Sequence, residues 1–256
     1  MKVLARGKIM VWEGASLWVL RGESAVAQVD LHSHHAIQIT ISLEGSFELK
    51  TADAEVSGPA AIVAADVGHV FSANGAVAML FIEPESLLGR LLASEWLGDQ
   101  AIAAIDPRTA ESARVALANA FQAGASTDRF RRIASDLLNS LAANAAPDLP
   151  DRRVTAMIDF ARARLDEPLS LTRVARHVNL SPSRASHLFV EQVGLPLKTY
   201  ILWLRLQKAV QRYSEGATLT DAAHGAGFAD SAHLSRTFRR MFGLPATALQ
   251  VNQCAP

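Results

Sequence analysis

Three histidines and a glutamine in the first third of the chain have the side chains best suited to hold a metal ion or a polar ligand. His32 and His34 begin a strand-like run, and because side chains alternate between the two faces of a strand, both imidazoles are expected on one side. Gln38 falls on the face of His34, and His35 on the opposite face. With His69 as the third imidazole, the set can bind Zn²⁺, Fe²⁺ or Ni²⁺, with Gln38 or water completing the shell.

The spacing of these residues resembles the first motif of the cupin barrel, His-X-His-X3-Glu-X6-Gly, with glutamine in place of the glutamate and Gly45 at the end. The second cupin motif is represented by Gly58 and His69, while Ala64 and Asp66 stand where its proline and glycine are usual. The resemblance implies a small antiparallel barrel whose interior holds the histidines.

Three interpretations of this cluster remain open. It is a metal site, a metal-free pocket for an organic effector, or a set of structural barrel residues. Trp12 and Trp18 are candidates for lining the same pocket, although aromatic residues on the first strands of a barrel also serve as core. The effector-binding set on this hypothesis is His32, His34, Gln38, His69, Trp12 and Trp18.

The chain around the cluster divides into a strand-rich and a helical part. Short β-branched runs broken by glycines extend from Lys8 to Glu83 and predict strands, with Gly45 closing one of them. Helical periodicity then predicts three helices. Their ranges are Ser86–Trp96, Pro107–Gln122 and Asp128–Asn144. The proline-containing stretch 145–151 is predicted to be an exposed linker.

The part after the linker contains a duplication. The apolar pattern that starts at Leu171 recurs at Leu219, 48 residues later, and each copy predicts a short amphipathic helix followed by a tight break. Asn179 and Gly227 suit the left-handed backbone of such breaks. Ser181 and Asp230 are then placed as N-caps of second helices. The spacing therefore predicts two helix-turn-helix units, joined by a helix from Leu197 to about Glu215.

The joining helix is about 28 Å long at 1.5 Å per residue. Two recognition helices that enter successive major grooves on one face of DNA lie about 34 Å apart, so this helix can set their separation.

In a helix-turn-helix unit, the side chains of the second helix that do not pack in the core face outward and can reach DNA. Arg236 is the predicted guanine contact, since its fork matches the O6/N7 pair, whereas Arg239 and Arg240 are predicted to hold phosphate. The complete outward set is Ser183, Arg184, Ser186 and His187 in the first unit and Ser231, His233, Ser235, Arg236, Arg239 and Arg240 in the second.

The charge of the chain supports this interpretation. The net charge is zero, but residues 1–150 hold 11 Lys/Arg and 17 Asp/Glu, and residues 151–256 hold 14 and 8. A basic half joined to an acidic half predicts that only the second meets a polyanion. A protein-binding bundle with a basic solvated face is the alternative.

Residues from about 152 to 250 resemble the DNA-binding domain of AraC/XylS-type transcription regulators. The resemblance is carried by Ala223, Gly227-Phe228, Ser231, the run Leu234–Arg239, Phe242-Gly243 and, in the first unit, Leu188-Phe189, Gly194 and Tyr200. Two departures are Asn179, where the family usually has glycine, and Leu249-Gln250, where its closing Tyr-Arg is expected.

The resulting prediction is an α+β protein with two domains. Residues 1–146 form a cupin-like barrel with a helical part at 86–144, which senses an effector and dimerises, and residues 152–256 form the all-α domain with two helix-turn-helix units. The predicted function is a sequence-specific DNA-binding transcription regulator modulated by a small molecule or metal ion. The resemblance implies a homodimer on double-stranded DNA, with RNA polymerase as a further partner.

Other classes of function are disfavoured by the sequence. A cupin metalloenzyme of the oxygenase type is the alternative, but the usual fourth ligand is replaced by glutamine, no catalytic triad or phosphate loop is recognised, and a non-enzyme is predicted. The single cysteine, Cys254, can form no disulfide within the chain. Apolar runs are too short to cross a bilayer, and the pattern of a signal peptide is missing, so a cytoplasmic location is expected.

Overall fold

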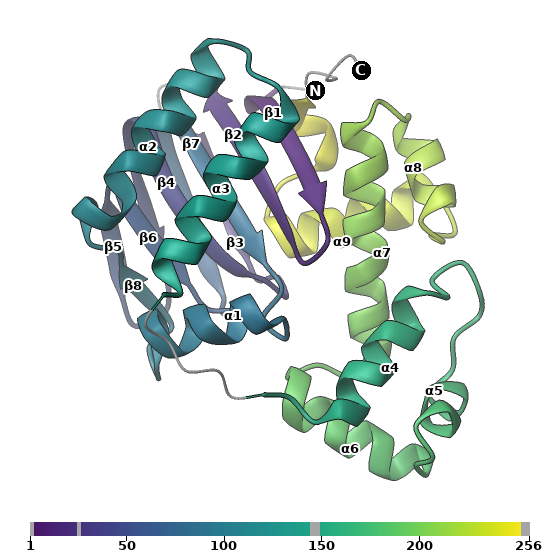
Figure 1. The fold of residues 1–256 in the computed structure, drawn as a ribbon. Helices are drawn as coiled ribbons and strands as arrows, with labels where there is room; N and C mark the ends of the chain where they lie inside the picture. The colour runs from purple at the N-terminus through teal and green to yellow at the C-terminus, as the bar shows by residue number, and fades with distance from the viewer. Residues whose placement is uncertain (1–2, 25–26, 144–148, 252–256) are drawn as a thin grey trace. The chain divides into compact units, whose positions relative to one another are not determined.

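The structure is a computed structural model that describes residues 3–24, 27–143 and 149–251. It has the predicted α+β composition, with an N-terminal sheet and C-terminal helices (Figure 1). Most of the predicted linker, and Cys254, lie outside the described residues. Within the described ranges the strands are β1 Ala5–Trp12, β2 Ala15–Gly22, β3 Ala27–His32, β4 Ile37–Lys50, β5 Glu55–Gly58, β6 Ala60–Val63, β7 His69–Ile82, β8 Ile102–Ala104 and β9 Leu249–Val251.

The strands form one sheet in the order β8-β6-β4-β7-β2-β1-β9, with β3 paired to β7 and β5 paired to β4. All pairs are antiparallel except β1 with β9, which is parallel. The two end strands of this order, β8 and β9, do not pair with each other within the described residues. The sheet is thus not closed, and the predicted cupin-like barrel is not confirmed.

Strands β4 and β7 pass through Gly45 and Gly75, although glycine was expected to end the first of them. The two glycines are partners in the ladder and have φ of 74° and 88°. A Cβ atom on Gly75 would lie 2.4 Å from the backbone oxygen of Glu44. The glycines therefore mark an irregularity within a long antiparallel pair, where two backbones approach too closely for a side chain, and not a strand end.

One face of the sheet is covered by helices (Figure 1). The core there joins Leu17, Val19 and Ile39 of the strands to Leu117 and Phe130 of the helices, all fully buried. These helices are α1 Leu87–Leu92, continued by the π-helical segment η1 Ala93–Leu97, then α2 Pro107–Gln122 and α3 Thr127–Leu141. The predicted helices are confirmed in number and approximate position, while β8 was not predicted.

The remaining helices contain the duplicated pattern. They are α4 Arg152–Arg162, α5 Leu171–His177, α6 Pro182–Val193, α7 Leu197–Ser214, α8 Leu219–Gly225 and α9 Ser231–Phe242, followed by the short 3-10 helix η2 Ala246–Ala248. Asn179 and Gly227 have φ of 56° and 79°, the left-handed conformation that the breaks require. Ser181 caps α6 by accepting from the Arg184 amide, and Asp230 caps α9 by accepting from the His233 amide.

Contacts between Cα atoms divide the chain into two compact units, residues 1–147 with 235–256, and residues 148–234. The last part of the chain, from Ser235 in α9 to the end of β9, is thus grouped with the sheet. The sequence-based boundary between residues 146 and 152 stays a prediction. None of the helices in the described residues has the length and apolar character needed to span a membrane.

Candidate functional site

The three predicted histidines converge. His32 ends β3 and is the ladder partner of His69, which begins β7, while His34 lies in the connection to β4. The sequence placed His32 and His34 on one strand, but they converge across the end of β3. One ring nitrogen from each of the three lies within 4.8 Å of the others, and all three side chains are buried.

Hydrogen bonds fix which nitrogen of each imidazole faces the cluster. The Nδ1 atoms of His32, His34 and His69 lie 2.8, 3.1 and 2.9 Å from backbone oxygens of Asp30, Ala36 and Val67. Since a carbonyl oxygen only accepts, each Nδ1 donates, and each Nε2 carries a lone pair. The buried Nε2 of His69 has no hydrogen-bond partner within the described part of the chain. This is the arrangement in which a second hydrogen bond orients a metal-ligating imidazole.

Gln38 lies beside His34, as predicted. Its Oε1 is 3.0 Å from His34 Nε2, and its Nε2 donates to Thr40 Oγ1 at 2.8 Å. When Nδ1 of His34 carries the proton, His34 Nε2 and Gln38 Oε1 are both hydrogen-bond acceptors. Their close contact is then favourable if a cation lies between them, or if the Gln38 carboxamide is flipped so that its NH2 group faces His34.

The histidines of the cluster are uncharged at neutral pH. Burial, with a smaller contribution from neighbouring imidazoles, lowers the pKa of His32 to about 4 and that of His34 to about 3. Burial also lowers the pKa of His69. A neutral imidazole is the form that binds metal, so no proton has to be removed before an ion binds at pH 7.

His35 faces the other way, as predicted, and forms a separate buried ion pair. Its Nδ1 is 2.7 Å from Asp66 Oδ2, and its Nε2 is 3.4 Å from Glu85 Oε2. Burial opposes the charged form, but the hydrogen bonds to the two carboxylates outweigh it and raise the pKa of His35 to about 9. Asp66 occupies a left-handed conformation, with φ of 62°, at the place where the cupin motif has glycine.

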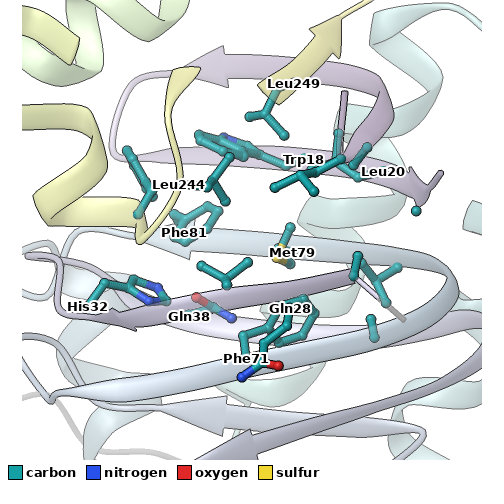
Figure 2. Close-up of a pocket in the computed structure, with 18 of the residues that line it drawn as sticks. Trp18, Leu20, Gln28, His32, Gln38, Phe71, Met79, Phe81, Leu244 and Leu249 are labelled. Atoms are coloured by element: carbon teal, nitrogen blue, oxygen red, sulfur yellow. The ribbon is translucent and has the colours of Figure 1, made fainter. Parts of the chain in front are cut away.

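Next to the cluster is an apolar pocket with a volume of about 70 Å³ (Figure 2). It opens on the sheet face opposite α2 and α3, where Leu20, Met79 and Phe81 are among the lining side chains. His32 and Gln38 line both the pocket and the histidine cluster, whereas His34 and His69 are not among the pocket-lining residues.

The two candidate tryptophans lie on different faces. Trp18 lines the pocket. Trp12 packs with the core beneath the helices, where the Arg131 guanidinium lies 5.9 Å from its ring centroid. The structure therefore brings Trp18, but not Trp12, together with the pocket.

One wall of the pocket comes from the end of the chain. Phe242, the last residue of α9, lies with its ring centroid 4.8 Å from Trp18, and Leu244 and Leu249 follow it around the pocket (Figure 2). Gly243 has no space for a side chain, because a Cβ atom there would lie 2.4 Å from the Asp30 backbone oxygen. Leu249 belongs to β9, which pairs with β1.

Sequence reasoning missed these residues. Phe238 and Phe242 are not in the predicted outward set of the second helix-turn-helix unit, which is consistent with their burial, but the sequence did not connect them with Trp18. The only signal was the departure at Leu249-Gln250, where apolar Leu249 replaces an expected tyrosine.

The predicted DNA-contacting side chains are accessible on α6 and α9. On α6, Ser183, Arg184 and His187 are exposed and Ser186 is half-buried. Residues of α6 outside the predicted outward set, namely Ala185, Leu188 and Phe189, are buried. On α9 the arginines are exposed and the smaller side chains are half-buried. The exposed set is Arg236, Arg239 and Arg240, and the half-buried set is Ser231, His233 and Ser235.

Comparison with known proteins supports the assignment of the helical part. A helix-turn-helix domain family matches residues 174–251. The uncharacterized HTH-type transcriptional regulator YpdC of Escherichia coli strain K12 is 35% identical over 81 residues, which are 30% of this chain and 28% of YpdC. The chain thus spans about a quarter of that relative, and 26% of GbdR of Pseudomonas aeruginosa.

Two further comparisons, one of sequence and one of structure, cover most of the chain. The "Probable transcriptional regulator LumQ" of Photobacterium leiognathi is 26% identical over 230 residues, 86% of this chain and 91% of LumQ. The crystal structure of ToxT from Vibrio cholerae O395 aligns with a TM-score of 0.60 at 10% identity, over 92% of this chain and 96% of ToxT. At that identity the likeness to ToxT shows the fold alone.

These findings define the class of the helical part. The chain carries a helix-turn-helix DNA-binding domain of the AraC type, and the resemblance to AraC-type transcription regulators is confirmed.

Proposed function

We propose that this chain is a sequence-specific DNA-binding transcription regulator whose affinity for DNA changes when a ligand binds in a cupin-like sensing domain. One observation carries the proposal. The pocket beside the histidine cluster takes one wall from Phe242, the last residue of the helix that presents Arg236, and from Leu244 and Leu249, which follow that helix in the chain. A ligand in the pocket touches the end of the second recognition helix.

The coupling would follow from differential contact. A ligand shifts an equilibrium between two arrangements only by its difference in affinity for them. A ligand that contacts Trp18 and Phe242 together favours the arrangement in which the end of α9 is held against the sheet. Since α9 also carries the predicted DNA contacts, ligand occupancy and DNA binding would share one structural element.

The ligand is a small molecule, a metal ion, or both. The three converging ring nitrogens support a metal ion, as does the Nε2 of His69, which has no hydrogen-bond partner among the described residues. The apolar lining supports an organic effector. A homodimer and a contact with RNA polymerase are proposed from the resemblance to AraC-type regulators.

The test is selection of DNA from a randomised library by the full chain, followed by affinity measurement on the enriched sequence. We expect a motif with two elements about one helical turn apart. Arg129→Ala, which removes an exposed arginine from α3, is the matched control for substitutions on α9. Equal affinity for enriched and random DNA would overturn the proposal.

A further inference from the structure

The histidine cluster and the apolar pocket share two residues, His32 and Gln38. Gln38 reaches His34 on one side and lines the pocket on the other. Besides these two, Gln28 is the one other side chain with a polar amide, imidazole or charged group among the lining residues (Figure 2). A ligand in the pocket meets these polar groups, of which His32 and Gln38 border the histidines, and also the indole N–H of Trp18, which has no hydrogen-bond partner among the described residues.

The charged groups near the point where the pocket meets the histidine cluster determine which kind of ligand can bind there. The described lining contains no lysine, arginine, aspartate or glutamate. A carboxylate would find no opposite charge there, and a divalent cation bound to three imidazoles would keep its full charge in apolar surroundings. Both situations are costly, because an isolated charge loses its hydration on burial. The two charges together compensate each other.

The nearby carboxylates do not supply that compensation. Asp66 and Glu85 are the acids paired with His35, which faces away from the cluster. Asp30, whose charge acts on His32, is exposed and forms an ion pair with Arg239. An ion held by His32, His34 and His69 would need an anion from outside this histidine set. Three protein ligands also leave a coordination position for a ligand that is not part of the protein.

We propose that the pocket binds a small apolar carboxylate whose oxygen is a ligand of a divalent metal ion held by His32, His34 and His69. This inference rests on the proposed ligand-responsive function and makes the metal ion and the organic effector joint occupants of one site. The cavity of about 70 Å³ has room for roughly five water-sized groups, which matches a short aliphatic or single-ring acid.

The first test is calorimetry on the full chain with Zn²⁺ and then hexanoate. We expect one Zn²⁺ per chain, and hexanoate binding at least tenfold tighter to the zinc-loaded protein than to the metal-free protein. 1-Hexanol, which has the same apolar body without the charge, should show no such dependence on zinc. Equal affinity of hexanoate with and without zinc, or failure of Zn²⁺ to bind, would overturn the proposal.

Two variants separate the metal from the pocket. His69→Ala should lose Zn²⁺ binding and, with it, the zinc-dependent part of hexanoate binding. Ala73→Leu, which adds bulk to a lining residue on β7, should keep Zn²⁺ and weaken hexanoate. If hexanoate binds His69→Ala as tightly as it binds the zinc-loaded chain, the metal is not its partner and the proposal fails.

A spectroscopic measurement reports direct coordination and does not depend on either variant folding. In the full chain loaded with Co²⁺, hexanoate should shift the visible absorption of the ion, and 1-hexanol should not. An unchanged spectrum at saturating hexanoate would show that the carboxylate does not reach the metal. Because these measurements contain no DNA, they can fail while selection of specific DNA succeeds, and the reverse also holds.

Discussion

Arg239 of α9 and Asp30 of β3 form an ion pair, with 3.3 Å between Nη2 and Oδ2. The amide of Asp30 also donates to the Gly243 oxygen at 3.3 Å, so the same residue holds the backbone just after α9. Arg239 is one of the predicted phosphate contacts. Asp30 and a DNA phosphate would therefore compete for one guanidinium group.

Asp30→Asn should raise affinity for DNA, because it removes this competitor while keeping the side-chain size. The pair is exposed, and exposed pairs are worth about 0.2 to 1 kcal/mol, so we expect a gain of up to about fivefold. Fluorescence anisotropy with the selected DNA measures it. Asp53→Asn, an exposed acid elsewhere in the chain, is the control. Unchanged or weaker binding by Asp30→Asn alone would show that the pair does not compete.

Arg236→Ala and Arg239→Ala should weaken DNA binding in different ways. Loss of a base contact at Arg236 should cost about 1 to 3 kcal/mol on the selected sequence and relax one base position. Loss of a phosphate contact at Arg239 should weaken binding to all sequences and reduce the salt slope by about one. Affinities at several salt concentrations on selected and scrambled DNA distinguish the two. An equal loss on all sequences for Arg236→Ala would make it a phosphate contact.

Gly75→Ala should lower the free energy of unfolding by more than the cost of placing alanine in a left-handed backbone conformation. A non-glycine residue in that conformation costs about 1 to 2 kcal/mol, and the close Glu44 oxygen adds a steric cost. Gly124→Ala is the matched control, since Gly124 has φ of 63° and no atom of the described residues lies within 4 Å of the added Cβ. Urea unfolding measures both variants. Equal losses would show that the two strands can separate enough to admit a methyl group.

Asp66→Asn should lower the free energy of unfolding by about 1 to 2 kcal/mol, because it leaves the buried His35 with one charged partner. Asparagine tolerates the left-handed backbone of this position, so the loss reports the charge and not the conformation. Thermal unfolding at pH 7 gives the value. A variant as stable as the parent would show that Glu85 alone satisfies the imidazolium.

The sequence predicted those features that depend on local spacing. The caps at Ser181 and Asp230, the breaks at Asn179 and Gly227, and the helix at Pro107–Gln122 follow from residue types within a few positions of one another. The convergence of the histidines was predicted because their spacing resembles the cupin motifs, which bring histidines from distant strands together.

What the sequence did not predict depends on contacts between distant segments. Gly45 can be recognised as a site of close backbone approach only once Gly75 is known to be its partner in the ladder. No sequence neighbour of either glycine distinguishes such an approach from a turn. The pocket wall formed by Phe242, Leu244 and Leu249 requires β9 to pair with β1, across more than 240 residues of chain. A three-residue strand gives too short a pattern to predict such a pairing.

The central claim is that occupancy of the pocket changes DNA binding. It is tested most directly by the affinity of the full chain for its selected DNA, with and without Zn²⁺ and hexanoate, once calorimetry has shown that both are bound. We predict a change of at least threefold that is lost in His69→Ala. The same affinity in the occupied and empty states would contradict the account, and would leave the chain a DNA-binding protein that does not respond to this site.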